Sequence, residues 1–427
     1  MRKMKDSGIE WIGEIPEGWG FKKLGRISEI ITDGTHQTPN YIDEGFPFIS
    51  IKDISSGKID FSGVKYISES QHKELYSHAP VKKGDILFTR IGTLGVFVEV
   101  DTDIVFDFFV SVGMIRLKKN IINQHYLIHY LNSPAVGNFI QSIKAGFGTA
   151  APKYNLTDVK RTWILFPPLE TQKQIADFLD AKTEKIDSLK RDIQKQIETL
   201  EQYKKSVITE TVTKGLNPNT KMKNSGSKWL PSFPAHWEMK KLKYNLSAHE
   251  VKGYAEKEVL SLYRELGIVP KNSRDDNHNV TSEDTSKYKY VRVGDFVINK
   301  MKAWQGSVAV SDFEGIVSPA YYIYEFTNDS YDKKYFHHLM RNKILADEFR
   351  RISGGIREGQ WDLDREQFEN MYLPVPPKAE QIEIVKFIES KYGNIEKSID
   401  LKKQQLEKLE EYKKSLIFEY VTGKREV

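Results

Sequence analysis

The sequence predicts a mixed α/β (α+β) protein in which two globular domains alternate with two long helices. Three observations predict this fold class. The chain contains an internal repeat, each repeat ends in apolar residues at heptad spacing, and the part before each heptad run has short β-branched and aromatic segments beside Gly-Asp turns. A length of 427 residues also exceeds what one ordinary core supports. We therefore expect globular domains at residues 1–165 and 216–374, and helical segments at residues 166–215 and 375–427.

The repeat begins with an opening element of glycine, tryptophan and proline residues. Its members recur 218 positions later, as the pairs Gly8 and Gly226, Trp11 and Trp229, Pro16 and Pro234, Trp19 and Trp237, and Leu24 and Leu242. In the later part of each half the offset is 209, as in the pairs Tyr126 and Tyr335, His129 and His338, Pro167 and Pro376, and Gln172 and Gln381. Length changes therefore fall in the early, loop-rich part of each half, and the late part behaves as a rigid element.

Within each globular domain, strand-like segments precede a helical one. The expected strands lie within residues 46–54, 84–92, 96–100 and 104–117 of the first domain, and within residues 288–301, 306–310 and 315–326 of the second. One helix is expected at residues 126–145, and its counterpart at residues 335–353.

The two helical segments carry the heptad pattern. Pro167 and Pro168 mark the start of the first, Gly215 follows its end, and about 45 residues at 1.5 Å per residue make a rod of roughly 65 Å. The predicted seam consists of Ile175, Leu179, Ile186, Leu189, Ile193, Leu200 and Val207 in the first helix, and Ile384, Ile388, Ile395, Leu409 and Leu416 in the second. Lys402 interrupts the second seam, where Ile399 and Leu406 widen the apolar stripe.

Two packing arrangements fit this pattern. Each helix could pack only on its own globular domain, or the two helices could pack on each other as an antiparallel coiled coil with pseudo-two-fold symmetry. The second arrangement is favoured, because neither helix has another apolar surface that would cover five heptads.

The composition limits the class of protein. Apolar residues make up 39% of the chain and charged residues 29%, which is typical of a globular protein. Without cysteine there is no disulfide framework and no thiolate metal site. No apolar window approaches the roughly 20 residues of a membrane span, and no secretory signal is recognised, so we expect a cytoplasmic protein without membrane contact. A net charge of +5 permits an anionic partner but does not require one.

The sequence contains no recognisable motif for catalysis. The sequence has no phosphate-binding P-loop and no His-Glu-x-x-His metal helix. The Pro-Pro pairs lack the preceding Asn or Asp of an amino-methyltransferase loop, and they are interpreted as helix starts. His129 and His338 occupy matching helical positions, where packed or capping side chains are expected. We therefore predict no catalytic residue and no bound metal or cofactor.

Loops with mixed basic, amide and aromatic side chains are the candidates for recognition. Arg, Lys, Gln and Asn can fork onto base edges in a major groove, while Thr and Lys can reach phosphates. The tryptophans could line such a groove or simply pack. The candidate DNA contacts are Thr35, His36, Gln37, Arg90 and Lys153 in the first domain, and Lys300, Lys302, Trp304, Gln305, Arg357, Gln360 and Trp361 in the second.

In the order and double occurrence of these motifs, the chain resembles the specificity (S) subunit of Type I restriction-modification systems. The resemblance covers essentially the whole chain. It rests on the opening Gly-x-x-Trp-x-x-x-x-Pro-x-x-Trp element, the Asp-Gly-Thr-His-x-Thr-Pro loop at Asp33, the Gly-Asp strands at Gly84 and Gly294, the Pro-Pro-Leu-x-x-Gln helix start, and the Tyr-Lys-Lys-Ser runs at Tyr203 and Tyr412. The second helix start departs from the motif, because Lys378 and Ala379 replace its leucine.

The resemblance implies a non-catalytic reader of double-stranded DNA. Each globular domain would be a target recognition domain for one half of a bipartite, asymmetric site, and the paired helices would set the spacer between the halves. Two methyltransferase (modification) subunits and the restriction subunits would dock on the chain, and they would bind S-adenosylmethionine, ATP and Mg²⁺. Two alternatives remain open: a bivalent protein-binding scaffold without DNA readout, which the basic loops disfavour, and a self-contained methyltransferase or nuclease, for which no motif is present.

Overall fold

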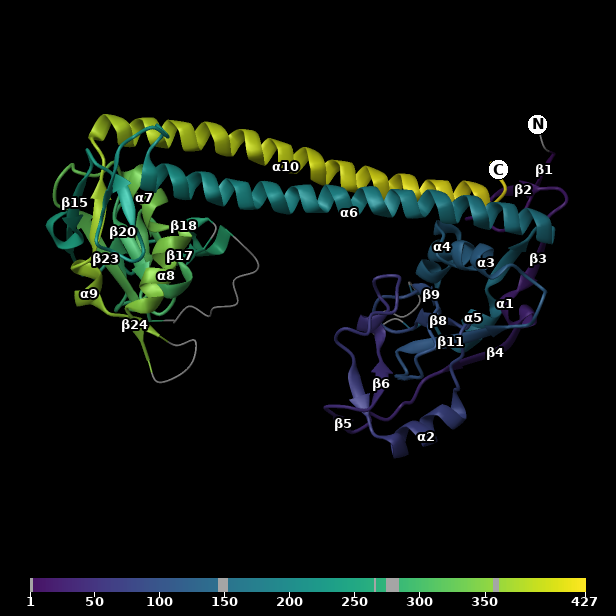
Figure 1. Ribbon diagram of the computed structural model, residues 1–427. Coiled ribbons are helices and arrows are strands. Elements are labelled where there is room, and N and C mark those ends of the chain that lie inside the picture. The colour runs from purple at the N-terminus through teal and green to yellow at the C-terminus, as the bar shows by residue number, and fades with distance from the viewer. Residues whose placement is uncertain (1–2, 145–152, 265, 274–283, 356–360) are drawn as a thin grey trace. The chain divides into compact units, whose positions relative to one another are not determined.

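Figure 1 shows the computed structural model, which describes residues 3–144, 153–264, 266–273, 284–355 and 361–427. The chain divides into two units. Unit 1 contains residues 1–193 and 403–427, and unit 2 contains residues 194–402. Each unit therefore combines one globular part with the beginning of one long helix and the end of the other.

An antiparallel four-stranded sheet, with the order β4-β11-β8-β9, forms the centre of unit 1. Its central strand β8 is buried on both faces. Ile86 and Phe88 contribute to a core shared with the helices, and Leu87 points into a second core on the other face, as alternation along a strand requires. The strands are β4 (Ser28–Asp33), β8 (Ile86–Thr89), β9 (Phe97–Glu99) and β11 (Val112–Leu117).

A second sheet of unit 1, with the order β10-β6-β7-β5, packs against helix α2 (Glu69–His78). His72 of α2 and Asp107 of the sheet form a buried pair, with 2.6 Å between Nδ1 and Oδ2. Burial raises the pKa of Asp107, although the contact with His72 opposes this shift. The strands are β5 (Tyr41–Ile42), β6 (Phe46–Ile49), β7 (Lys65–Ile67) and β10 (Asp107–Phe108).

The predicted helix at residues 126–145 is instead two helices, and the same break occurs in unit 2. Pro134 begins the second helix of unit 1, a position that needs no backbone donor, and the side chain of Asn342 accepts from Ile344 N at the corresponding start in unit 2. The remaining elements of unit 1 are β1 (Met4–Asp6), β2 (Glu14–Pro16), β3 (Gly20–Lys23), α1 (Leu24–Ile27), α3 (Gln124–Leu131), α4 (Pro134–Lys144), α5 (Leu156–Arg161) and β12 (Trp163–Phe166).

Unit 2 repeats the central sheet of unit 1. Its order is β16-β23-β20-β21, and all of its pairs are antiparallel. The strands are β16 (Leu246–Ala248), β20 (Phe296–Asn299), β21 (Val308–Val310) and β23 (Tyr321–Phe326). Five two-stranded pairings accompany it among the described residues: β13 (Met222–Asn224) with β14 (Ser232–Pro234), β15 (Glu238–Lys241) with β26 (Tyr372–Val375), β17 (Leu260–Tyr263) with β18 (Gly267–Pro270), β19 (Lys289–Val291) with β22 (Gly315–Val317), and β24 (Ser353–Gly354) with β25 (Asp362–Leu363).

Three shorter helices of unit 2, α7 (Lys333–Met340), α8 (Lys343–Arg351) and α9 (Arg365–Glu369), contribute to the core on one face of this sheet and are labelled in Figure 1. Phe296 of β20 shares the core of unit 2 with Phe336 of α7, Phe349 of α8 and Phe368 of α9. The mixed α/β fold class predicted from the sequence is thus confirmed.

The repeated opening element packs on the end of a long helix in each unit. In unit 1, a Cβ on Gly423, which follows α10 (Lys378–Val421), would lie 2.6 Å from Pro16 and 2.9 Å from Trp19. In unit 2, a Cβ on Gly215, which follows α6 (Leu169–Lys214), would lie 3.3 Å from Trp237. Both glycines have positive φ, as a residue that ends a helix in the left-handed region requires.

Two matching tyrosines also bind the helix ends. Tyr126 donates to the carbonyl oxygen of Val421 at 3.3 Å, and Tyr335 donates to that of Val212 at 2.9 Å. Each helix start is fixed in turn by a fully buried glutamine. Gln172 accepts from Asn123 N and donates to Pro167 O, both at 2.8 Å, and Gln381 makes the equivalent bonds with Asp332 N and Pro376 O. The motifs repeated in the sequence are therefore those that attach both long helices to each globular part.

Helices α6 and α10 run antiparallel and contact each other in both units (Figure 1). In unit 1, Lys190 pairs with Glu410 at 2.5 Å and Asp187 with Lys413 at 2.7 Å. In unit 2, Lys204 pairs with Glu396 at 2.7 Å. The predicted seam residues Ile175, Leu179, Ile186, Ile384, Ile388, Ile395 and Leu416 are buried, and Ile193, Leu200, Val207 and Leu409 are half-buried.

Leu189 was wrongly placed in the seam, because its side chain is 44% exposed. The second track of α6 instead runs through Lys190, the buried Ile197 and Lys204. Lysine fits there because its aliphatic stem packs in the seam while its ammonium group reaches a carboxylate on the facing helix.

No helix in the described ranges of the chain is long and apolar enough to cross a membrane.

Candidate nucleic-acid interface

In unit 1, three candidate loops that are far apart in the sequence meet beside the central sheet. Arg90, at the end of β8, contacts the carboxylate of Asp33 at the end of β4. Its guanidinium also donates to Val110 O at 3.1 Å and to Tyr154 O at 3.4 Å. Lys153 joins them through a backbone bridge between its own position and Ile91. The structure thus brings together Asp33, Arg90 and Lys153, which the sequence separates by more than a hundred residues.

Arg90 has a structural role in this arrangement. The residue is 7% exposed, and its side chain is bonded to groups of unit 1 on several sides. Its direct contact with DNA stays a prediction, whereas its contact with Asp33 holds the start of the loop at residues 35–37 in place. Lys153 is exposed, and its ammonium group is accessible to a ligand.

The loop after Asp33 presents hydroxyl, imidazole and amide groups to solvent. His36 is 73% exposed at its side chain, and its Nε2 lies 3.3 Å from Asp33. Thr35 hydroxyl accepts from Gln37 N at 3.2 Å, which shapes the loop locally. Gly34 makes the loop possible, because a Cβ at this residue would lie 2.0 Å from Phe108 O. A loop seated this closely on the backbone of β10 holds Thr35, His36 and Gln37 in one orientation.

In unit 2, the two predicted loops also converge. Lys300 Nζ lies 2.9 Å from Asp362 Oδ2, and Leu363 N donates to Lys300 O at 3.0 Å. The rings of Trp304 and Trp361 are half-buried and tilted against each other, with centroids 5.3 Å apart. Lys302 is exposed next to them. Arg357 and Gln360 lie outside the described residues.

Arg350 is a cation of this surface that sequence reasoning missed. It extends from α8, and its guanidinium carbon lies 5.9 Å from the Trp304 ring and 5.5 Å from the Trp361 ring. On a helix, Arg350 looks like any solvent-facing charge, so the sequence carried no signal for it. Arg264 is a second missed cation, and it contacts the side chain of Gln305. A cationic and aromatic surface of this kind can stack on bases and attract phosphate.

The two surfaces differ in chemistry. Unit 1 presents Thr35, His36 and Gln37 on a tightly held loop, and unit 2 presents tryptophans covered by arginine. Structurally equivalent strands carry both surfaces, because Arg90 follows β8 and Lys300 follows β20. Two surfaces that share one scaffold but carry unlike side chains would suit unlike ligand sequences.

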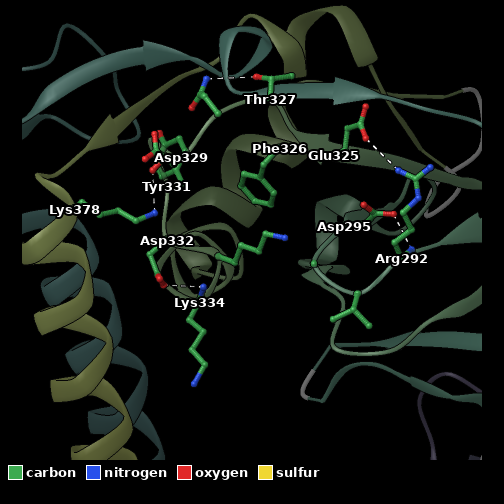
Figure 2. A pocket seen from close by; sticks show the side chains of 14 residues that line it. Arg292, Asp295, Glu325, Phe326, Thr327, Asp329, Tyr331, Asp332, Lys334 and Lys378 are labelled. Atoms are coloured by element: carbon green, nitrogen blue, oxygen red, sulfur yellow. Dashed lines mark hydrogen bonds and ion pairs between the residues drawn. The ribbon is translucent and has the colours of Figure 1, made fainter.

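A hollow beside the start of α7 is a different kind of site. Figure 2 shows this cavity of about 720 Å³, into which Lys378, Asp332, Arg292 and Glu325 project. Several of its charged groups are already bonded within unit 2: Arg292 lies 3.3 Å from Glu325, and Lys378 donates to Asp329 O at 2.9 Å. No candidate DNA contact lines it. The cavity therefore carries no argument for a ligand.

The described residues offer no group for metal chemistry. Within those ranges, no three histidine or acidic side chains are arranged to hold a metal ion. His337 and His338 of α7 are half-buried, and loss of solvent around the rings lowers the pKa of His337 to about 3 and that of His338 to about 4. His338 is thus a packed, neutral side chain, as the sequence predicted.

Comparison with known proteins shows the family of this chain. A family model described as the Type I restriction modification DNA specificity domain matches residues 16–199 and 235–411. The putative type I restriction enzyme MjaX specificity subunit of Methanocaldococcus jannaschii is 25% identical over 420 residues, which cover 97% of this chain and 95% of that protein. The EcoKI specificity subunit of Escherichia coli strain K12 is 23% identical over 423 residues, with coverage of 91% and 86%.

Two solved structures share the fold. One was determined for complex assembly and conformational transition of the type I R-M system; it has a TM-score of 0.67 at 17% identity and covers 95% of this chain and 98% of that chain. The HsdS subunit from Thermoanaerobacter tengcongensis has a TM-score of 0.50 at 18% identity, with coverage of 96% and 98%. The family model matches both halves of the chain, and the relatives align over nearly their full length. The chain therefore belongs to the DNA specificity subunits of Type I restriction-modification systems.

Proposed function

We propose that each unit reads one half of a bipartite, asymmetric DNA site and that the α6–α10 pair sets the spacer between the halves. The observation that carries this proposal is the separate convergence of candidate loops in each unit. Asp33, Arg90 and Lys153 meet in unit 1, and Lys300, Trp304 and Trp361 meet in unit 2. Because the two groups differ in chemistry, the half-sites would differ in sequence.

The rest of the complex would supply the reactions. In this proposal two methyltransferase subunits, one for each half of the repeat, and the restriction subunits dock on the chain. They bind S-adenosylmethionine, ATP and Mg²⁺, and the chain itself acts in the cytoplasm as a non-catalytic reader. The duplication of the sequence supports a two-copy partner, since a repeated surface offers the same docking site twice.

Exchange of one reading surface tests the assignment of half-sites. Residues 28–118, which run from β4 to just past β11, should be replaced by the matching segment of another specificity subunit. Such a chimera keeps the opening element, Gln172 and both long helices. Sequencing of methylated sites in a host with the full complex should show one altered half-site and one unaltered half-site. Change in both halves, or in neither, would contradict the proposal.

DNA binding by the complex also separates this proposal from a protein scaffold. Affinity should fall with rising salt, because lysine and arginine contacts release counterions from phosphates. Binding without salt dependence, or no binding by the intact complex, would favour the scaffold instead.

A matched deletion tests the spacer function of the helices. Residues 198–204 of α6 face residues 396–402 of α10 in unit 2, where Lys204 pairs with Glu396. Removal of both segments takes one heptad from each helix, keeps the seam in phase, and shortens the pair by about 10 Å, or about three base pairs of DNA. The methylated motif should keep both half-sites and lose about three spacer positions.

The control removes residues 198–204 alone. This deletion leaves seven residues of α10 without facing partners, and methylation should fall strongly. A motif with an unchanged spacer after the matched deletion would exclude the helix pair as the ruler.

A further inference from the structure

The contact between α3 and α6 in unit 1 is made by two histidines that share one carboxylate. His125 and His129 lie one turn apart on α3, and both contact Asp180 of α6. His125 Nδ1 lies 2.7 Å from one oxygen of Asp180, and His129 Nε2 lies 2.7 Å from the other. Asp180 belongs to α6, so these contacts fasten the globular part of unit 1 to the long helix.

The charged groups that act on His125 besides Asp180 are also acidic. Glu99 of β9 lies 3.4 Å from His125 Nε2, and Asp177 of α6 adds a further negative charge, one helical turn before Asp180. His129 is only 13% exposed at its side chain, whereas His125 is 54% exposed. The cluster is not arranged to hold a metal ion, as noted above for the described ranges. It is therefore a contact whose strength depends on histidine protonation.

The direction of titration follows from these neighbours. The hydrogen bond with Asp180 and the charges of Asp180, Glu99 and Asp177 raise the pKa of His125 above its ordinary 6.5, although partial burial opposes the shift. Burial of Asp180 is outweighed by its contacts with His129 and His125, so its pKa is lowered. The pKa of His125 is higher in the folded protein than in the unfolded chain. The stability that its ion pair adds is therefore complete below about pH 6.5 and is lost as the pH rises through the pKa of the folded protein.

The equivalent contact in unit 2 does not titrate near neutral pH. The repeat places Lys334 at the position of His125, His338 at that of His129, and Glu389 at that of Asp180. Lys334 Nζ lies 2.7 Å from Glu389, which raises the pKa of a group already charged at neutral pH. His338 stays neutral, because burial lowers its pKa to about 4. Helix α7 is thus attached to α10 by a permanent ion pair.

We propose that the α3–α6 contact of unit 1 is a pH-sensitive latch, closed in mildly acidic solution and weakened in alkaline solution, while the α7–α10 contact of unit 2 holds across this range. The exchange of a titrating side chain for a permanently charged one lies at one position of the repeat, His125 in unit 1 and Lys334 in unit 2. A change of pH would then loosen one reading unit and leave the other attached to its helix.

Hydrogen exchange on the full chain between pH 5.5 and 8.5, corrected for the intrinsic effect of pH on exchange, provides the test. Protection of α3 should fall about two- to fivefold relative to α7 over this range, the size expected for a partly exposed ion pair. An equal change in the hydrogen-exchange protection of α3 and α7 over this pH range would overturn the proposal.

Reciprocal substitutions provide matched controls. His125→Lys should remove most of the pH dependence of α3, because lysine stays charged at pH 8.5. Lys334→His should create the same dependence in α7. Both side chains are more than half exposed, at 54% and 69%, so neither substitution disturbs a core. Melting temperatures at pH 6 should match the wild type for both variants. Retention of the α3 response in His125→Lys, or no response of α7 in Lys334→His, would also contradict the latch.

Discussion

Replacement of Gly34 with alanine should weaken DNA binding by about 10- to 100-fold and erase recognition of the half-site read by unit 1. A Cβ at Gly34 would lie 2.0 Å from Phe108 O and 2.8 Å from the carbonyl carbon of Phe109. Both are backbone atoms of the neighbouring segment and cannot rotate away, so the loop itself must move. Thr35, His36 and Gln37 would then lose their fixed orientation, and a pair of base contacts is worth about 1–3 kcal/mol. Overpacking should also lower the free energy of unfolding by about 1–3 kcal/mol.

The measurement combines binding of the intact complex to its own site with sequencing of methylated sites. Gly63→Ala is the matched control, because this loop glycine of unit 1 has no atom within 4 Å of its added Cβ and its φ is not positive. It should leave both binding and the methylated motif unchanged. Wild-type recognition by the Gly34→Ala protein would show that the loop after Asp33 does not read DNA.

The second large effect is expected from Arg116→Met, which should destabilise unit 1 by about 3–5 kcal/mol. Arg116 forms a two-pronged ion pair with Asp85, with Nε to Oδ1 at 2.8 Å and Nη2 to Oδ2 at 2.6 Å. Asp85 is 2% exposed, so removal of the guanidinium leaves a buried carboxylate without its charged partner. The pair ties the turn before β8 to β11, which pairs with both β4 and β8, the strands that precede the candidate loops of unit 1.

In thermal unfolding, this loss of stability should lower the melting temperature by about 6–20 °C for a unit of this size. The double substitution Arg116→Met with Asp85→Asn should recover much of it, because no charge is then buried alone. Arg351→Met is the surface control. Its partner Glu348 lies 2.7 Å away, but Arg351 itself is 62% exposed, and the loss should stay below about 1 kcal/mol. A single Arg116→Met variant as stable as Arg351→Met would refute the buried-pair argument.

The sequence predicted most of the secondary structure because its signals are local. Alternating apolar residues and Gly-Asp turns indicated the strands of both central sheets, and β8 and β20 lie where they were expected. The two helices predicted before the long ones were each split, by Pro134 and by Asn342. Proline favours the first position of a helix, and asparagine favours the cap before it, so both residues fit the start of a second helix. The apolar pattern alone did not show that a second helix begins there.

The candidate site was only partly predictable. Thr35, His36, Gln37, Trp304 and Trp361 were found from loop composition, and the structure groups them with residues distant in the sequence. Arg350 was missed, since its nearness to the tryptophans depends on how α8 packs. Arg90 was identified as a cation, but its burial against Asp33 depends on the pairing of strands that are far apart in the chain.

The sequence by itself determined the duplication, the mixed α/β class and the two long amphipathic helices, because repeats, turns and heptads are read from neighbouring residues. Only the tertiary structure decided that each unit takes the start of one helix and the end of the other, that Lys190 and Lys204 rather than Leu189 face the partner helix, and which loops meet. These features depend on contacts between residues far apart in the chain. A lysine stem in a seam and a buried arginine are stable only because a carboxylate from another segment reaches them.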